Sequence, residues 1–112
     1  MNLEERVELL EFQNELLYNG TEIDRFLFEC KITKNQYHSL MNLMDEMSKA
    51  IRSGAEPHHA EFESKVYQIV PERDMDYHFC ELFTKYLAEE GRWPEVFSIL
   101  YSAMPKYKSQ TP

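Results

Sequence analysis

A polar stretch around His78 brings together the side chains best suited to metal chemistry. On a helix that starts near Asp74, His78 would face Asp74 four residues before it and Glu81 three residues after it. Imidazole and carboxylate groups in this arrangement are ligands for zinc and other divalent ions. A simpler explanation competes with this one, because acids favour the first turn of a helix and an exposed histidine often pairs with an acid. We favour the simpler explanation.

A pair of adjacent histidines forms the second candidate metal site. His58 and His59 are followed by Glu61 and Glu63, and His58 can meet Glu61 at i, i+3. Adjacent residues on a helix point about 100° apart, so the two imidazoles do not easily share one ion. A metal site here would require His78 to approach one of them in space. Surface histidines at the start of a helix are the favoured interpretation.

Other kinds of catalysis find little support. The sequence has no Gly-x-Ser-x-Gly turn, and each of its three glycines is explained as a helix stop rather than as part of a phosphate-binding loop. Cys30 and Cys80 lie far apart, without CxxC spacing or an adjacent base. We therefore expect both to be reduced, buried, small hydrophobic residues. The sequence predicts no catalytic residue and no cofactor.

Helices must position these side chains, because apolar residues recur with a period near 3.6 along most of the chain. Capping residues, glycines and prolines mark where the helices begin and end. The expected helical segments are 3–18, 21–30, 34–52, 57–70, 74–90 and 94–104. Even the strand-like residues 66–70 fit the helical pattern. The sequence therefore predicts an all-α, compact bundle of about five to six helices, as one domain over 1–105 with a flexible tail over 106–112.

The first helix is unusual because it carries two apolar stripes instead of one. The first stripe has the 4-3-4-3 spacing of a coiled-coil seam and consists of Leu3, Val7, Leu10, Asn14 and Leu17. The second stripe consists of Leu9, Phe12 and Leu16. The remaining arc is acidic and holds Glu4, Glu8, Glu11 and Glu15. Since one stripe suffices to bind a helix to its own domain, a second copy of the chain could cover the other.

The first stripe is therefore the predicted oligomer interface. Asn14 occupies an a-type position, where a polar residue fixes register and oligomeric state. Alternatively, it is a hydrogen-bonded amide buried in a globular bundle, because only about two heptads are present. We expect an intertwined homo-oligomer, either a trimer or a dimer, and an unidentified protein is a second candidate partner.

Two further features have alternative explanations. Met41, Met44 and Met47 could form an adaptable surface for a partner, although such a stripe is more often core, as we expect here. Trp93 could be an exposed docking residue, but packing in the corner after Gly91 is the favoured interpretation.

Composition limits the classes of partner. The 112-residue chain is 43% hydrophobic and carries a formal net charge of −8, which argues against binding to nucleic acid or to an anionic membrane surface. No apolar run approaches the length of a membrane span, and the first residues lack the basic region of a signal peptide. We therefore expect a cytoplasmic protein.

The order of these features resembles the YhaI-like proteins, a family of short chains from Bacillus-type bacteria. The matching segments are 6–10, 23–26 with Phe28, 33–34, 45–48 and 90–91. The resemblance implies an all-helical fold that forms an intertwined homo-oligomer. It carries no known activity, so it transfers no functional residues.

The leading hypothesis is a small cytoplasmic helical protein that acts through protein–protein contacts and self-association. The alternative is a metal-binding protein or metal-dependent enzyme that uses His78 with nearby carboxylates. A weaker third hypothesis is a regulator that acts on DNA-bound partners without touching DNA itself.

Overall fold

The computed structural model describes residues 1–104 and 106, and this part of the chain contains six α-helices, one short 3-10 helix and no strand. The elements are α1 (Leu3–Asn19), α2 (Glu22–Glu29), α3 (Lys34–Arg52), α4 (His59–Ile69), the 3-10 helix η1 (Pro71–Arg73), α5 (Tyr77–Glu89) and α6 (Pro94–Leu100). The predicted all-α class is confirmed.

Local signals place the first three helices as the sequence predicts. The side chains of Asn2 and Thr21 accept hydrogen bonds from backbone amides in the first turns of α1 and α2. At the start of α3, Thr33 and Gln36 form a capping box in which each side chain bonds the other residue's backbone amide. Gly20 ends α1 with a φ of +66°, a left-handed conformation that glycine adopts without steric cost.

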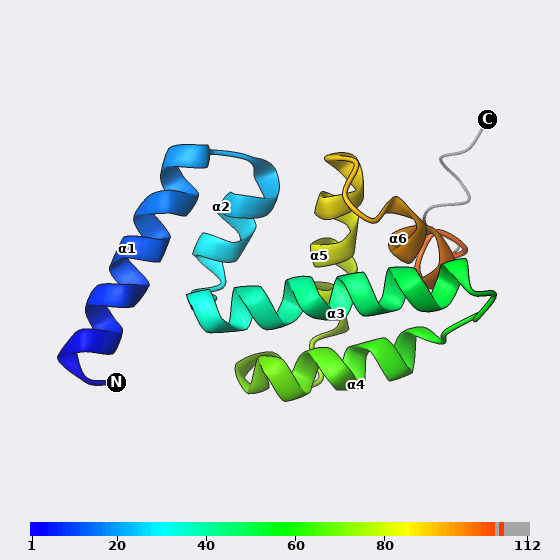
Figure 1. Ribbon diagram of the computed structural model, residues 1–112, viewed down its shortest axis with the longest axis horizontal. Coiled ribbons are helices and arrows are strands. Elements are labelled where there is room, and N and C mark those ends of the chain that lie inside the picture. Colours follow the sequence, from blue (N-terminus) through cyan, green and yellow to red (C-terminus); the bar gives the residue numbers. More distant parts are fainter. Residues whose placement is uncertain (105, 107–112) are drawn as a thin grey trace.

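The helices pack in antiparallel pairs along the molecule (Figure 1). α1 and α2 form the pair at one end, and α3 and α4 form a longer pair through the middle. α5 crosses behind α3 and also contacts α2, α4 and α6. The result measures 48 × 27 × 25 Å, with α1 at one end of the long dimension and α6 toward the other.

One cluster of buried apolar side chains connects all six helices. It extends from Phe12 and Leu16 of α1 to Tyr101, which follows α6. Its largest members with almost no exposed surface are Phe62, Phe83 and Tyr101. Each helix is therefore attached to the others through one buried face, as expected for amphipathic helices.

The later helices are shorter than their patterns predict. α4 begins at His59 instead of near Pro57. α5 begins at Tyr77 instead of near Asp74, because residues 71–76 form η1 and a turn. α6 ends at Leu100, so Met104 lies beyond the helix that was expected to include it. Of the predicted tail, Lys106 belongs to the described part, and 107–112 lie outside it.

Candidate functional site

The two stripes of α1 have opposite surroundings. Phe12 and Leu16 are buried, with exposed fractions of 5% and 3%, and the Phe12 ring centroid lies 5.4 Å from that of Tyr37 on α3. The coiled-coil seam (Leu3, Val7, Leu10, Asn14 and Leu17) points away from the core. Its four apolar members are 75%, 44%, 64% and 54% exposed. Residues 1–104 and 106 of one chain therefore cover α1 on one side only.

The seam has no cover from the described part of the same chain. Asn14 is exposed, so the alternative in which its amide is buried within a globular bundle is wrong for the single chain. The acidic arc of Glu4, Glu8, Glu11 and Glu15 is also exposed, and none of these carboxylates forms an ion pair within the described residues.

The candidate metal cluster around His78 does not form among the described residues. Asp74 lies in the turn before α5, so it is not one helical turn from His78, and the assumed i, i+4 relation is wrong. Asp76 caps α5 by accepting a hydrogen bond from the backbone amide of Phe79. His78 is exposed, whereas Glu81 is only 2% exposed and lies in the core. Asp74, His78 and Glu81 therefore lie in a turn, at the surface and in the core, respectively, and do not form one ligand set.

The adjacent histidines have separate roles at the start of α4. Nδ1 of His58 accepts a hydrogen bond from the backbone amide of Ala60, so His58 is the N-cap. Nδ1 of His59 lies 3.2 Å from Oε2 of Glu63, one turn along the helix. The possible contact between the side chains of His58 and Glu61 is not present, since the His58 ring is bonded to the backbone amide of Ala60 instead. Among residues 1–104 and 106, no three His, Cys, Asp or Glu side chains form a group that could hold a metal ion.

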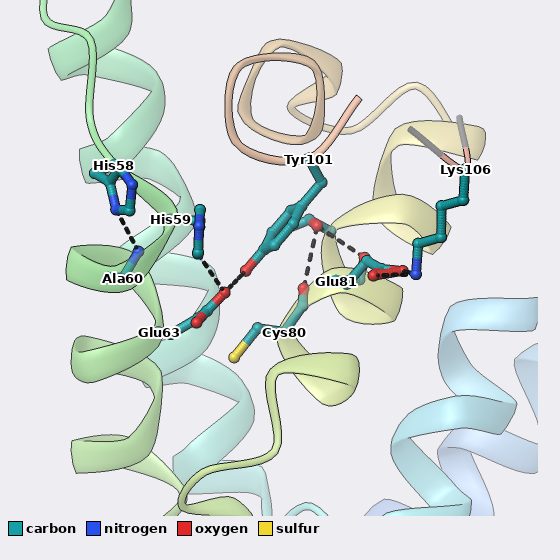
Figure 2. Close-up of polar contacts among 9 residues, drawn as sticks. His58, His59, Ala60, Glu63, Cys80, Glu81, Tyr101 and Lys106 are labelled. Atoms are coloured by element: carbon teal, nitrogen blue, oxygen red, sulfur yellow. Dashed lines mark hydrogen bonds and ion pairs between the residues drawn. The ribbon is translucent and has the colours of Figure 1, made fainter. Parts of the chain in front are cut away.

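The structure instead brings together a cluster centred on Glu63, an acid of the second candidate site, whose contact with Tyr101 was not predicted (Figure 2). The Tyr101 hydroxyl donates a 2.6 Å hydrogen bond to Oε2 of Glu63, the same oxygen that lies near His59. Glu63 is 9% exposed and Tyr101 is fully buried. Burial and the hydrogen bond to the Glu63 carboxylate both raise the pKa of Tyr101 above its usual value. The tyrosine therefore remains a neutral donor that holds the carboxylate in place.

A second buried carboxylate lies on the other side of Tyr101. Glu81 forms an ion pair with Lys106, whose Nζ lies 2.7 Å from Oε2 of Glu81 (Figure 2). Pairing lowers the cost of burying the charge, which is large for an isolated carboxylate. The contact also holds the chain after α6 against α5. Glu81 is thus a structural residue, and the prediction that placed it beside His78 did not anticipate this contact.

The cysteines are unsuited to nucleophilic chemistry. Both are free thiols; Cys80 is completely buried and Cys30 is half-buried. Burial raises the pKa of Cys80 to about 12 and also raises the pKa of Cys30. Since the thiolate is the reactive form, neither is an activated nucleophile. The expectation of a buried small hydrophobic residue is confirmed for Cys80 and holds only in part for Cys30.

The methionine stripe and Trp93 are structural, as expected. Met44 and Met47 are buried in the core, and Met41 is partly buried against it. Trp93 has a φ of +47° at the start of α6 and packs against the core, with the Arg92 guanidinium 5.3 Å from the centroid of its ring. Both features therefore belong to the interior and to the α5–α6 corner, and the coiled-coil seam is a separate exposed surface.

No helix in the described part of the chain is long and apolar enough to cross a membrane. Comparison with known protein families, curated proteins and solved structures found no match to this chain.

Proposed function

We propose that this is a small cytoplasmic helical protein that acts through protein–protein contacts, and that it self-associates through the coiled-coil seam of α1. The observation that carries the proposal is the exposure of four large apolar side chains in one row, on a helix that already buries Phe12 and Leu16 of its other stripe in the core. Contiguous exposed apolar surface of this kind marks an interaction site in most proteins. The resemblance to the YhaI-like family, which implies an intertwined homo-oligomer, agrees with this proposal.

The sequence of the seam favours a second copy of the same chain as the partner. With Leu3, Leu10 and Leu17 at d positions, Val7 and Asn14 fall at a positions. A β-branched residue at a with leucine at d favours two strands, and an asparagine at a fixes their register. We therefore propose a dimer as the unit of self-association.

The charges beside the seam favour parallel helices. Arg6 falls at a g position and Glu11 at the e position five residues later, which is the pair that meets across a parallel coiled coil. Two copies would then form two such pairs. In an antiparallel arrangement, e positions face e positions, so Glu4 and Glu11 would meet like charges. The charge pattern therefore supports a parallel dimer.

The energetics support a reversible complex. Full burial of a leucine or valine contributes about 1.5–3 kcal/mol, so covering a half-exposed one contributes about half as much. Four such side chains from each copy give roughly 6–12 kcal/mol. The loss of translational and rotational freedom on association costs about 4–15 kcal/mol. The largest gain with the smallest cost leaves about 8 kcal/mol, which corresponds to a dissociation constant of about 1 μM, so we expect a reversible dimer that dissociates at micromolar concentrations.

Sedimentation of the full chain over a range of micromolar concentrations tests the proposal. We expect a concentration-dependent dimer, and Val7→Asp should abolish it because the seam would bury an unpaired charge. Ser39→Asp adds the same charge to an exposed position of α3 and should leave the dimer intact. A wild-type chain that remains monomeric throughout the range would refute the proposal.

A charge exchange tests the parallel arrangement. Arg6→Glu should weaken the dimer, because it places an acid opposite Glu11 of the second copy. The double variant Arg6→Glu with Glu11→Arg should restore it, since the opposite charges are again paired. If the double variant is as weak as the single variant, the two residues do not meet and the parallel arrangement is wrong.

A further inference from the structure

A cavity of about 610 Å³ opens beside Glu63, between the first turns of α4 and α5 and the chain that follows α6. The described residues that line it are His59, Glu63, Tyr77, Met104 and Lys106. A second hollow of about 520 Å³ lies against α4 and η1 and is also lined by Glu63. Binding sites for small molecules commonly have volumes of about 300–1,000 Å³. The carboxylate of Glu63 therefore borders two hollows of sufficient size for a ligand.

No lysine or arginine among the described residues pairs with Glu63. Its Oε2 atom accepts the Tyr101 hydrogen bond and lies 3.2 Å from Nδ1 of His59, and a phenol supplies no positive charge. Among the described residues, no cation other than the His59 ring lies within ion-pair distance of Glu63, and its Oε1 atom has no hydrogen-bond partner there. The amine of Lys106 forms an ion pair with Glu81. One wall of the cavity therefore carries a carboxylate that is held in a fixed position and has no described lysine or arginine partner.

We propose that this cavity binds a small organic cation, consisting of an ammonium group on an apolar body. The ammonium would lie at the Glu63 carboxylate, where a charge-assisted hydrogen bond is stronger than a neutral one. The apolar body would lie against Met104 and Tyr77, and the aromatic ring also attracts a cation through its π face. An anionic ligand would instead meet the charge of Glu63 in a chain whose net charge is already −8.

Three probes with the same aromatic body test the proposal on the full chain: 2-phenylethylamine, 2-phenylethanol and phenylacetate. Binding is followed by NMR through the ¹³C-labelled methyl group of Met104, which lies in the wall of the cavity. We expect the ammonium to bind about tenfold more tightly than the alcohol, and the carboxylate to bind most weakly. Equal binding of the ammonium and the alcohol, or no shift of the Met104 signal, would overturn the proposal.

Two matched variants assign the effect to one carboxylate. Glu63→Gln retains an oxygen that can accept the Tyr101 hydrogen bond but removes the charge, so the preference for the ammonium should disappear. Glu61→Gln removes the same charge from an exposed position of α4 and should retain the preference. If Glu63→Gln binds the ammonium as tightly as the wild type, the site is not at Glu63. If Glu63→Gln does not fold, the comparison of the three probes on the wild-type chain still decides the question.

Discussion

Leu16 and Leu17 of α1 allow a direct test of which side of the helix the core holds. They are neighbours of the same type, yet Leu16 is 3% exposed and Leu17 is 54% exposed. Replacement of either leucine by alanine makes the same small change in helix propensity. The difference between the two variants therefore measures burial alone.

The magnitudes follow from the surroundings of each side chain. Leu16 belongs to the buried cluster that joins α1 to the rest of the fold, so Leu16→Ala should lower the free energy of unfolding by about 2–5 kcal/mol. Leu17→Ala in a dissociated chain should change it by about 0.5 kcal/mol or less, as for most surface substitutions. In the dimer the second effect should grow, because Leu17 would then be covered.

Urea unfolding at two protein concentrations measures both effects. At a concentration where sedimentation shows monomer, we expect a large loss for Leu16→Ala and almost none for Leu17→Ala. At a concentration where the dimer is present, Leu17→Ala should also lower the midpoint, since dimerisation stabilises the folded chain. Equal losses for the two variants in the monomer would refute the description of α1 as a helix with one buried stripe.

Three further outcomes can be measured on the folded chain. Tyr101→Phe removes the hydroxyl that donates to buried Glu63 and should lower the free energy of unfolding in urea by about 1–3 kcal/mol. Cys80, with a pKa of about 12, should resist alkylation by iodoacetamide at about pH 8 until the chain unfolds, as mass spectrometry would show. The hydrogen bond from Ser48 lowers the pKa of Glu95, so its contribution is present above the pKa of the unfolded glutamate, about 4.3, and is lost as the pH falls through the lower folded value. Ser48→Ala should therefore reduce the loss of stability between about pH 7 and about pH 3.

The parts of the fold that local signals control could be predicted from the sequence. The helix over 34–52 begins with a capping box whose two partners are three residues apart, and the structure places α3 at the same bounds. The second apolar stripe of α1 could also be predicted, because the spacing of its residues is a pattern within one helix. By contrast, the chain over 71–76 has the composition of a helix start but forms η1 and a turn, in which Met75 has a φ of +67°. Helix periodicity carries no information on such backbone angles.

The cluster around Glu63 could not be predicted, because its contacts join distant parts of the chain. The pairing of His59 with Glu63 is an i, i+4 relation that the sequence does contain. The hydrogen bond from Tyr101 spans 38 residues and depends on how α6 packs, for which no local pattern exists. Helical periodicity shows which residues are neighbours on one helix, but it does not show which of them the core buries. The sequence therefore predicts Glu81 beside His78 and gives no sign that Glu81 is buried.

The two proposed surfaces should act independently because they lie at opposite ends of the molecule. α1 occupies one end of the 48 Å dimension, whereas the chain after α6, which lines the cavity beside Glu63, lies toward the other (Figure 1). A second copy bound along the seam would therefore leave both cavities of the dimer open. Val7→Asp should abolish the dimer without changing the affinity for 2-phenylethylamine, whereas Glu63→Gln should do the reverse. If one variant removed both properties, the two surfaces would be coupled, and the proposed separation of assembly from ligand binding would be wrong.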